Sequence, residues 1–136
     1  MTKFEGSLDT NVLLRALLND IPEQHLLAKT LIEKPGARYC VADTALIELV
    51  FVLERHYRFN REQIADALEG LVMHPKLSCN KSVLLQSAKS FIVHRSLSFE
   101  DCYLAQCAKE TGSTPLWTFD KRLASQCEEA EQIKKK

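Results

Sequence analysis

The sequence predicts an α/β protein, a three-layer sandwich in which helices flank a central, mostly parallel sheet of four to five strands. Three observations favour this class. Short apolar stretches alternate with longer segments of helical periodicity along the chain. No two predicted strands are joined by a hairpin turn, so right-handed helical crossovers must connect them. The length of 136 residues suits a single domain with a substantial core.

Charge and hydropathy restrict the function classes. Eighteen basic and 18 acidic residues give a formal net charge of zero, which argues against nucleic-acid binding by bulk charge. Binding of a few phosphates by a local group of basic residues is still compatible with a net charge of zero. The chain has no run near the roughly 20 apolar residues of a membrane span and no apolar signal-peptide core, so we expect no membrane association.

The cysteines indicate a reducing compartment. There are five, an odd number without a CxxC pair, and we expect reduced thiols in a cytoplasmic protein rather than a disulfide framework. The cysteines and the four histidines also lack the spacing of a zinc site.

The first half of the chain is predicted to contain two strands, each followed by helices. The expected elements are a strand at 3–8, helices from 10 and from 22, a strand at 38–42 and a helix from 44. Asp9 ends the first strand, and taken alone it is best interpreted as a helix cap. Pro22 occupies a first helical turn, and Asp43 is also interpreted as a cap.

Glu48 stands out because it is the only polar residue between Ala45 and Leu53. A helix that is apolar all round is expected to be buried, and a buried carboxylate is costly unless it is paired or bound to a cation. We therefore predict a functional or metal-linked role for Glu48. The alternative is a buried salt bridge to an arginine.

The second half is predicted to alternate in the same way. The expected elements are a helix from 61 capped by Asn60, a short strand at 76–79, a helix at 81–95, a helix from 99, a strand at 115–119 and a helical turn at 121–124. Residues 1–127 are expected to form one domain, and residues 128–136 a polar C-terminal tail. The sequence after Leu123 is a poor strand former, so the sheet has four strands if no strand forms there.

Two further acids mark the stretch from Ser98 to Leu123. Ser98 and Asp101 have the spacing of a capping box, and Gly112 is expected to end the helix. Asp101 heads a stripe with Leu104, Ala105 and Ala108 that is predicted to face the core. Asp120 follows the last predicted strand at its carboxyl edge, where parallel sheets bind ligands.

Four acids therefore point to the same edge of the predicted sheet: Asp9, Glu48, Asp101 and Asp120. Carboxylates packed together repel one another, so they either hold raised pKa values or bind a cation. Oxygen ligands select a hard ion such as Mg²⁺ or Mn²⁺. The chemistry that such a site supports is metal-assisted phosphodiester hydrolysis.

These residues lie in four stretches that resemble the PIN domain superfamily, and within it the VapC type of toxin ribonuclease. The stretches are Leu8–Arg15, Ala45–Leu49, Ser98–Ala105 and Leu116–Leu123. Their order and spacing cover nearly the whole chain.

The resemblance implies a role for six residues, and the position of three basic residues near the acids adds further candidates. The acidic quartet is Asp9, Glu48, Asp101 and Asp120, with Asp9 and Asp101 as the direct metal ligands and Glu48 and Asp120 completing the site directly or through water. Asn11 and Thr118 match positions that support the acids by hydrogen bonds. Arg15, Lys121 and Arg122 are candidates for phosphate contacts, and a solvated surface role is the alternative for each.

The resemblance also implies an activity and partners. It implies an endoribonuclease that depends on Mg²⁺ or Mn²⁺, acts on RNA, forms a homodimer and is blocked by a small VapB-like antitoxin. A second hypothesis is a PIN-fold protein that binds a partner or RNA without efficient cleavage. A receiver-like signalling domain lacks its acidic pair and lysine here, and a 5′-nuclease or phosphatase would use the same metal chemistry.

Overall fold

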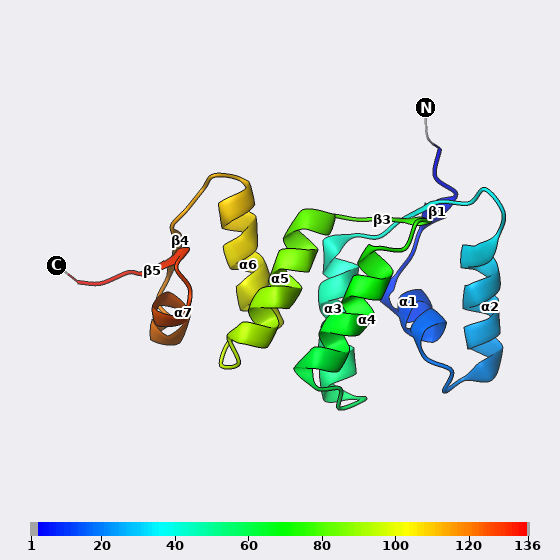
Figure 1. Ribbon diagram of the computed structural model, residues 1–136, viewed down its shortest axis with the longest axis horizontal. Helices are drawn as coiled ribbons and strands as arrows, with labels where there is room; N and C mark the ends of the chain where they lie inside the picture. The colour runs from blue at the N-terminus through cyan, green and yellow to red at the C-terminus, as the bar shows by residue number, and fades with distance from the viewer. Residues whose placement is uncertain (1–2, 136) are drawn as a thin grey trace. The chain divides into compact units, whose positions relative to one another are not determined.

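The computed structural model describes residues 3–135, and the chain divides into two compact units (Figure 1). The N-terminal unit extends to Lys81 and the C-terminal unit begins at Ser82. Each unit combines helices with parallel strands, so the predicted α/β class with parallel strands flanked by helices is confirmed. Within the described residues, no helix has the length and hydropathy that a membrane crossing requires.

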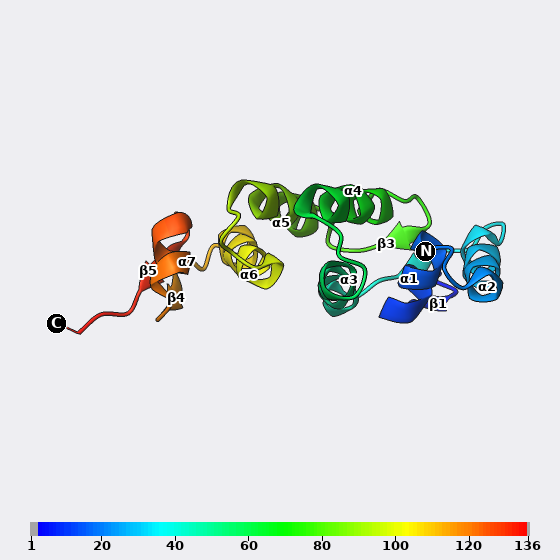
Figure 2. The ribbon, with the colours of Figure 1, turned by 90° about the horizontal axis from the view of Figure 1, so that it is seen from below.

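The N-terminal unit is a three-stranded parallel sheet with four helices. In chain order its elements are β1 (Gly6–Ser7), α1 (Thr10–Leu17), α2 (Pro22–Glu33), β2 (Tyr39–Cys40), α3 (Asp43–Arg55), α4 (Arg61–Val72) and β3 (Leu77–Ser78). The strand order is β1-β2-β3, with Gly6 opposite Tyr39 and Tyr39 opposite Leu77. Helix α1 lies between α2 and α3 (Figure 2). Because α1 directly follows β1 in the chain, its first residues stand at the carboxyl end of that strand.

Side-chain caps set several of these helix starts. Asn60 caps α4 through a complete capping box with Gln63, each side chain bonding the other residue's backbone N–H at 2.8 Å. Pro22 is the first residue of α2, as predicted. Asp43 is instead the first residue of α3, after Ala42 at the cap position. The interpretation of Asp43 as a cap is therefore wrong.

Helix α3 is buried on one face only, which corrects the expectation of a helix apolar all round. Its buried residues are Leu46, Leu49, Val50 and Leu53. Phe51 is 49% exposed and is covered on one side by the Arg55 guanidinium, 4.5 Å from its ring centroid. Glu48 is also exposed. Apolar residues on the outer face thus made the helix resemble a fully buried one.

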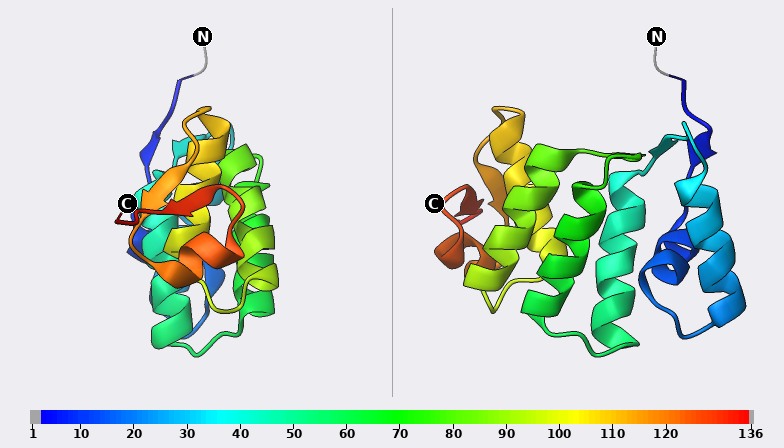
Figure 3. Two further views of the ribbon diagram at one scale, coloured as in Figure 1. Left: turned by 90° about the vertical axis from the view of Figure 1, so that its left-hand side faces the viewer. Right: turned by 45° about the vertical axis from the view of Figure 1, so that its right-hand side comes forward.

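The C-terminal unit contains a two-stranded parallel sheet. Its elements are α5 (Lys81–Val93, whose first residue closes the N-terminal unit), α6 (Phe99–Glu110), β4 (Leu116–Thr118), α7 (Lys121–Gln126) and β5 (Ala130–Gln132). β4 and β5 pair in parallel, with Leu116 opposite Ala130 (Figure 3, left). Helices α5 and α6 are joined through Phe91 and Phe99, whose rings meet edge to face at 5.5 Å between centroids.

Helix α6 presents to the core a face that matches the predicted one only in part. Its buried residues are Phe99, Cys102, Ala105 and Ala108, whereas Leu104 is 43% exposed. Ala105 and Ala108 are therefore buried as predicted, whereas Phe99 and Cys102 take the buried places expected for Asp101 and Leu104.

The predicted end of α6 at Gly112 is confirmed. Gly112 has a φ of +67°, which the absence of a Cβ permits. The backbone N–H groups of Ser113 and Gly112 donate to Ala108 and Lys109, the pattern of a Schellman motif.

Strand β5 forms inside the segment that was expected to be a polar tail. Leu116 N–H donates to the Glu129 carbonyl, and Ile133 N–H donates to the Thr118 carbonyl. Ala130 is buried and Glu131 is exposed, so the strand alternates between two faces. Residues 3–135 therefore contain five strands, three in one unit and two in the other. A single sheet that joins them stays a prediction.

Candidate active site

Asp9 connects the end of β1 to the start of α1. Its backbone is extended, and its Oδ1 accepts a hydrogen bond from the Val12 N–H at 3.0 Å. Its interpretation as a helix cap is therefore confirmed. The carboxylate is exposed and stands at a helix N-terminus, where the helix dipole favours negative charge. Capping uses one carboxylate oxygen and fixes the orientation of the other.

Glu48 is linked to the residue after Asp9. The Thr10 hydroxyl lies 3.1 Å from Oε2 of Glu48 and 3.1 Å from the carbonyl oxygen of Ala45. α1 follows β1 and α3 follows β2, and these two strands are paired in parallel. Asp9 and Glu48 therefore belong to the same edge of one sheet. Because Glu48 is exposed, both the prediction of a buried carboxylate and the alternative of a buried salt bridge are wrong.

Asn11 and Arg15 lie beside Asp9 on α1. The three side chains line a cavity of about 310 Å³ between α1 and α2. Its remaining lining residues are Val12, Gln24, Leu27, Ala28 and Leu31. The cavity is thus polar on the α1 side and largely apolar on the α2 side. The hydrogen-bonding role of Asn11 stays a prediction.

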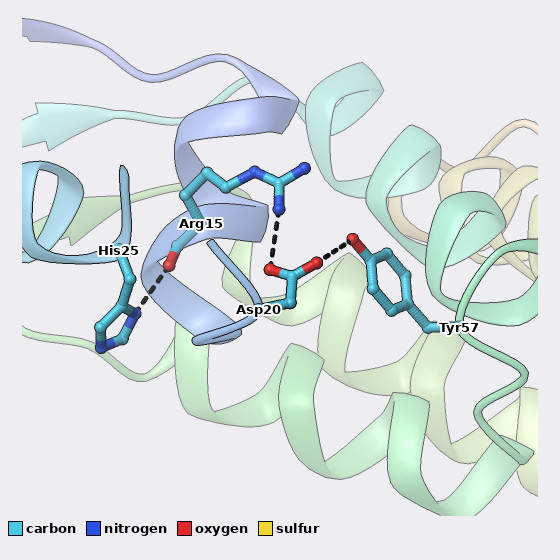
Figure 4. Close-up of polar contacts among 4 residues, drawn as sticks. All are labelled: Arg15, Asp20, His25 and Tyr57. Carbon is cyan, nitrogen blue, oxygen red and sulfur yellow. Dashed lines mark hydrogen bonds and ion pairs between the residues drawn. The ribbon is translucent and has the colours of Figure 1, made fainter. Parts of the chain in front are cut away.

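Arg15 belongs to a cluster that sequence reasoning missed (Figure 4). Its Nη1 donates to Oδ1 of Asp20 at 2.8 Å, and the Tyr57 hydroxyl donates to Oδ2 of Asp20 at 2.7 Å. The Nδ1 of His25 lies 2.8 Å from the Arg15 carbonyl oxygen. Asp20 and Tyr57 are 37 residues apart, so no local spacing in the sequence could have signalled this contact.

The cluster shifts the ionisation of its members in consistent directions. The pKa of Asp20 is lowered, chiefly by the hydrogen bond from Tyr57; burial opposes this effect, and the hydrogen bond and charge of Arg15 lower the pKa further. The pKa of Tyr57 is raised, mainly because Asp20 accepts its proton in a hydrogen bond. The pKa of Arg15 is raised by its hydrogen bond with Asp20.

These directions predict an acid-dependent stability difference between the wild type and Asp20→Asn. A lowered carboxyl pKa stabilises the fold above the unfolded value of 3.8, and this contribution is lost as the pH falls through the folded pKa. The two proteins should therefore differ most above pH 3.8 and converge below it, as followed by urea denaturation.

In Tyr57→Phe, NMR titration should show the Asp20 pKa moving up toward its ordinary value. An unchanged Asp20 pKa in that variant would contradict the assignment of cause.

In the C-terminal unit, Asp101 lies in the first turn of α6 and is half-buried. The Ser98 hydroxyl accepts its backbone N–H at 3.1 Å, so Ser98 caps this helix as predicted. The pKa of the buried Cys127 thiol is raised, chiefly by burial and to a smaller extent by the charges of Glu129 and Asp101.

Asp120 caps α7 much as Asp9 caps α1. Its Oδ1 accepts hydrogen bonds from the backbone N–H groups of Arg122 at 2.8 Å and Leu123 at 3.2 Å. Its own backbone N–H donates to the Thr118 hydroxyl at 3.0 Å. Thr118 therefore contacts Asp120 through the backbone.

The two basic residues after Asp120 are both exposed. Lys121 lines a cavity of about 680 Å³ with Trp117 and Lys134, among other residues. Nη1 of Arg122 lies 3.5 Å from the Ser96 carbonyl oxygen, a long contact for a hydrogen bond. The phosphate contacts of these two residues stay predictions.

The quartet is divided between the units, with Asp9 and Glu48 in one and Asp101 and Asp120 in the other. Across residues 3–135, no three His, Cys, Asp or Glu side chains are grouped so as to hold a metal ion. The convergence of all four acids stays a prediction. The donor set itself fits Mg²⁺ or Mn²⁺, because it offers only carboxylate oxygens, on side chains that are exposed or half-buried.

Two comparisons with known proteins identify the family of this chain. Residues 7–129 match the family model of the PIN domain. A VapC ribonuclease from Aquifex aeolicus (strain VF5) is 26% identical over 117 residues, which cover 85% of this chain and 87% of the relative. Because the matched region contains all four acids and most of the chain, the protein belongs to the PIN domain family.

Proposed function

We propose that this protein is an endoribonuclease that depends on Mg²⁺ or Mn²⁺ and is the toxin of a type II toxin–antitoxin pair. The observation that carries the proposal is the PIN domain match over residues 7–129, which includes every member of the acidic quartet. The similarity to a protein named VapC ribonuclease supports the choice of RNA. The proposal treats residues 1–127 as one nuclease domain located in the cytoplasm.

In this proposal, Asp9 and Asp101 hold the metal, while Glu48 and Asp120 complete the site directly or through water. A bound divalent ion would neutralise phosphate charge and lower the pKa of a water molecule. The chain itself orients the acids. Oδ1 of Asp9 is held by one backbone N–H and Oδ1 of Asp120 by two, and the Thr10 hydroxyl lies within hydrogen-bond distance of Oε2 of Glu48. These contacts restrict the rotation of three carboxylates before any ligand binds.

The proposed RNA contacts lie beside Asp120. Lys121 and Arg122 are exposed and follow this acid directly, so their charges are available to phosphates on either side of the cleaved bond. Because the chain has a formal net charge of zero, RNA binding would depend on such local basic residues. A homodimer and a small VapB-like antitoxin complete the proposal, by analogy with VapC-type proteins.

Metal binding by the quartet predicts a rise in melting temperature. A ligand that binds only the folded state stabilises it by about 2.7 kcal/mol at 100 times its Kd. Adding MgCl₂ or MnCl₂ to the EDTA-treated protein should therefore raise the melting temperature, as followed by differential scanning calorimetry. NaCl at equal ionic strength separates specific binding of the divalent ion from salt screening. A melting temperature that is insensitive to both metals would contradict a metal site.

Cleavage of total cellular RNA tests the activity. Wild-type protein with Mg²⁺ or Mn²⁺ should cut RNA, and EDTA should stop it. Metal-dependent stabilisation without cleavage would favour the second hypothesis, a PIN-fold protein that binds RNA or a partner without efficient cleavage. Neither cleavage nor a metal effect would reject the proposed nuclease.

A further inference from the structure

Helix α1 is joined to α3 by polar side chains at both of its ends. At its start, the Thr10 hydroxyl lies 3.1 Å from Oε2 of Glu48. Near its end, Arg15 contacts Asp20, which accepts a hydrogen bond from Tyr57, a residue located just after α3 (Figure 4). Both ends of α1 are therefore connected by hydrogen bonds to α3 or to the residue that follows it closely.

The second connection depends on both carboxylate oxygens of Asp20. Oδ1 accepts from Arg15 at 2.8 Å and Oδ2 accepts from Tyr57 at 2.7 Å. The Arg15 side chain is only 17% exposed. Its charge is therefore balanced by Asp20 and largely covered, which makes Arg15 a weak candidate for the phosphate contact predicted from the sequence. A charge-assisted pair of this kind is well suited to holding a backbone segment in place.

A short helix needs such contacts. α1 has eight residues, fewer than an isolated helix needs to be stable in water, so packing and side-chain contacts determine its position. Its buried residues are Leu13 and Leu14. These apolar contacts resist separation from the core but give little directional control, whereas hydrogen bonds have a preferred distance and angle.

We propose that Asp20 and Tyr57 are positioning residues that act through Arg15 and α1 to set the separation of Asp9 from Glu48. Asp9 caps α1 and Glu48 belongs to α3, so any slide or rotation of α1 along α3 changes their separation. This inference rests on the proposed function, because the separation matters for metal binding. Partners that orient metal ligands typically contribute about 10- to 100-fold to affinity or activity.

The test compares Tyr57→Phe and Asp20→Asn with a matched control in the full-length protein. Tyr57→Phe removes one hydroxyl and keeps the ring. The control is Glu33→Gln, which removes a carboxylate from the exposed Lys29–Glu33 pair, 3.8 Å apart on α2. Mn²⁺ affinity without RNA, kcat and KM for RNA are measured well below the melting temperature of every variant.

If Asp20 and Tyr57 position α1, the variants should show a specific pattern of Mn²⁺ affinity, kcat and KM. Tyr57→Phe should weaken Mn²⁺ binding and lower kcat by about tenfold, Asp20→Asn should do so more strongly, and KM for RNA should stay unchanged. Glu33→Gln should match the wild type. Altered KM with unchanged Mn²⁺ affinity would show that Arg15 meets phosphate, and it would overturn the inference, as would wild-type behaviour of both variants.

A second measurement separates this inference from the proposed function. In the metal-free protein, the amide NMR signals of Thr10 and Glu48 should shift in Tyr57→Phe and stay in place in Glu33→Gln. If the wild type neither binds Mn²⁺ nor cuts RNA, the proposed function fails. The NMR shifts would still report whether the contact between Asp20 and Tyr57 affects the position of α1. Unshifted Thr10 and Glu48 signals would show that the cluster does not position α1.

Discussion

Replacing Asp101 by asparagine will abolish metal-dependent RNA cleavage and leave the fold intact. Asparagine has nearly the same shape, but it removes the negative charge with which Asp101 is proposed to hold the metal. Residues that only orient a metal ligand contribute about 10- to 100-fold to metal affinity or activity. Loss of a direct metal ligand should therefore lower kcat/KM by more than about 100-fold. The substitution leaves the hydrogen bond from the backbone N–H of residue 101 to the Ser98 hydroxyl in place. The melting temperature of the metal-free protein should therefore change little.

The neighbouring acid provides a matched control. Glu100 is exposed and points about 100° away from Asp101 around α6, so Glu100→Gln removes the same charge from the same turn. It should retain wild-type cleavage. RNA fragments can be resolved on denaturing gels, with Mg²⁺ and with EDTA. Full activity of Asp101→Asn would remove Asp101 from the site, and equal losses in both variants would point to the general charge of the helix.

Replacing Leu13 by alanine will produce the largest loss of stability among the changes considered. Leu13 is fully buried on α1, and shortening a buried leucine removes apolar contacts and leaves a cavity. The expected cost is about 2–5 kcal/mol in the free energy of unfolding, measured by urea denaturation. Leu27→Ala on α2 makes the same chemical change at a side chain that is 65% exposed, and it should have little effect.

The Leu13 variant also tests the dependence of the proposed site on α1. At temperatures where the variant is folded, cleavage should fall further than its folded fraction, because Asp9 caps this helix. A cost below about 1 kcal/mol would mean that α1 repacks around the cavity. Activity that follows only the folded fraction would mean that α1 keeps its position without the leucine.

Local signals allowed much of the fold to be predicted from the sequence. Asp9, Asn60 and Ser98 were interpreted as caps because a cap involves residues only two or three positions apart. Gly112 was recognised because the end of a helix often requires a positive φ. Each of these features depends on a few neighbouring residues and can therefore be read from the sequence.

Features set by distant residues could not be predicted in this way. The exposure of Glu48 depends on which face of α3 meets its neighbours, and apolar residues on both faces concealed that choice. Strand β5 forms because β4 offers it backbone hydrogen bonds, although its own side chains are mostly polar. The contact between Thr10 and Glu48 joins residues 38 positions apart, so only the folded chain reveals it.

The double use of aspartate as helix cap and proposed metal ligand has a genetic consequence. Asparagine caps a helix about as well as aspartate, and a single base change converts an aspartate codon into an asparagine codon. Asp9 and Asp120 both cap helices. One aspartate-to-asparagine mutation at either position should therefore inactivate the proposed enzyme and still yield a folded protein. Cells under selection to escape such a nuclease would thus have a short mutational route, and laboratories would have an inactive form suited to crystallisation with intact RNA.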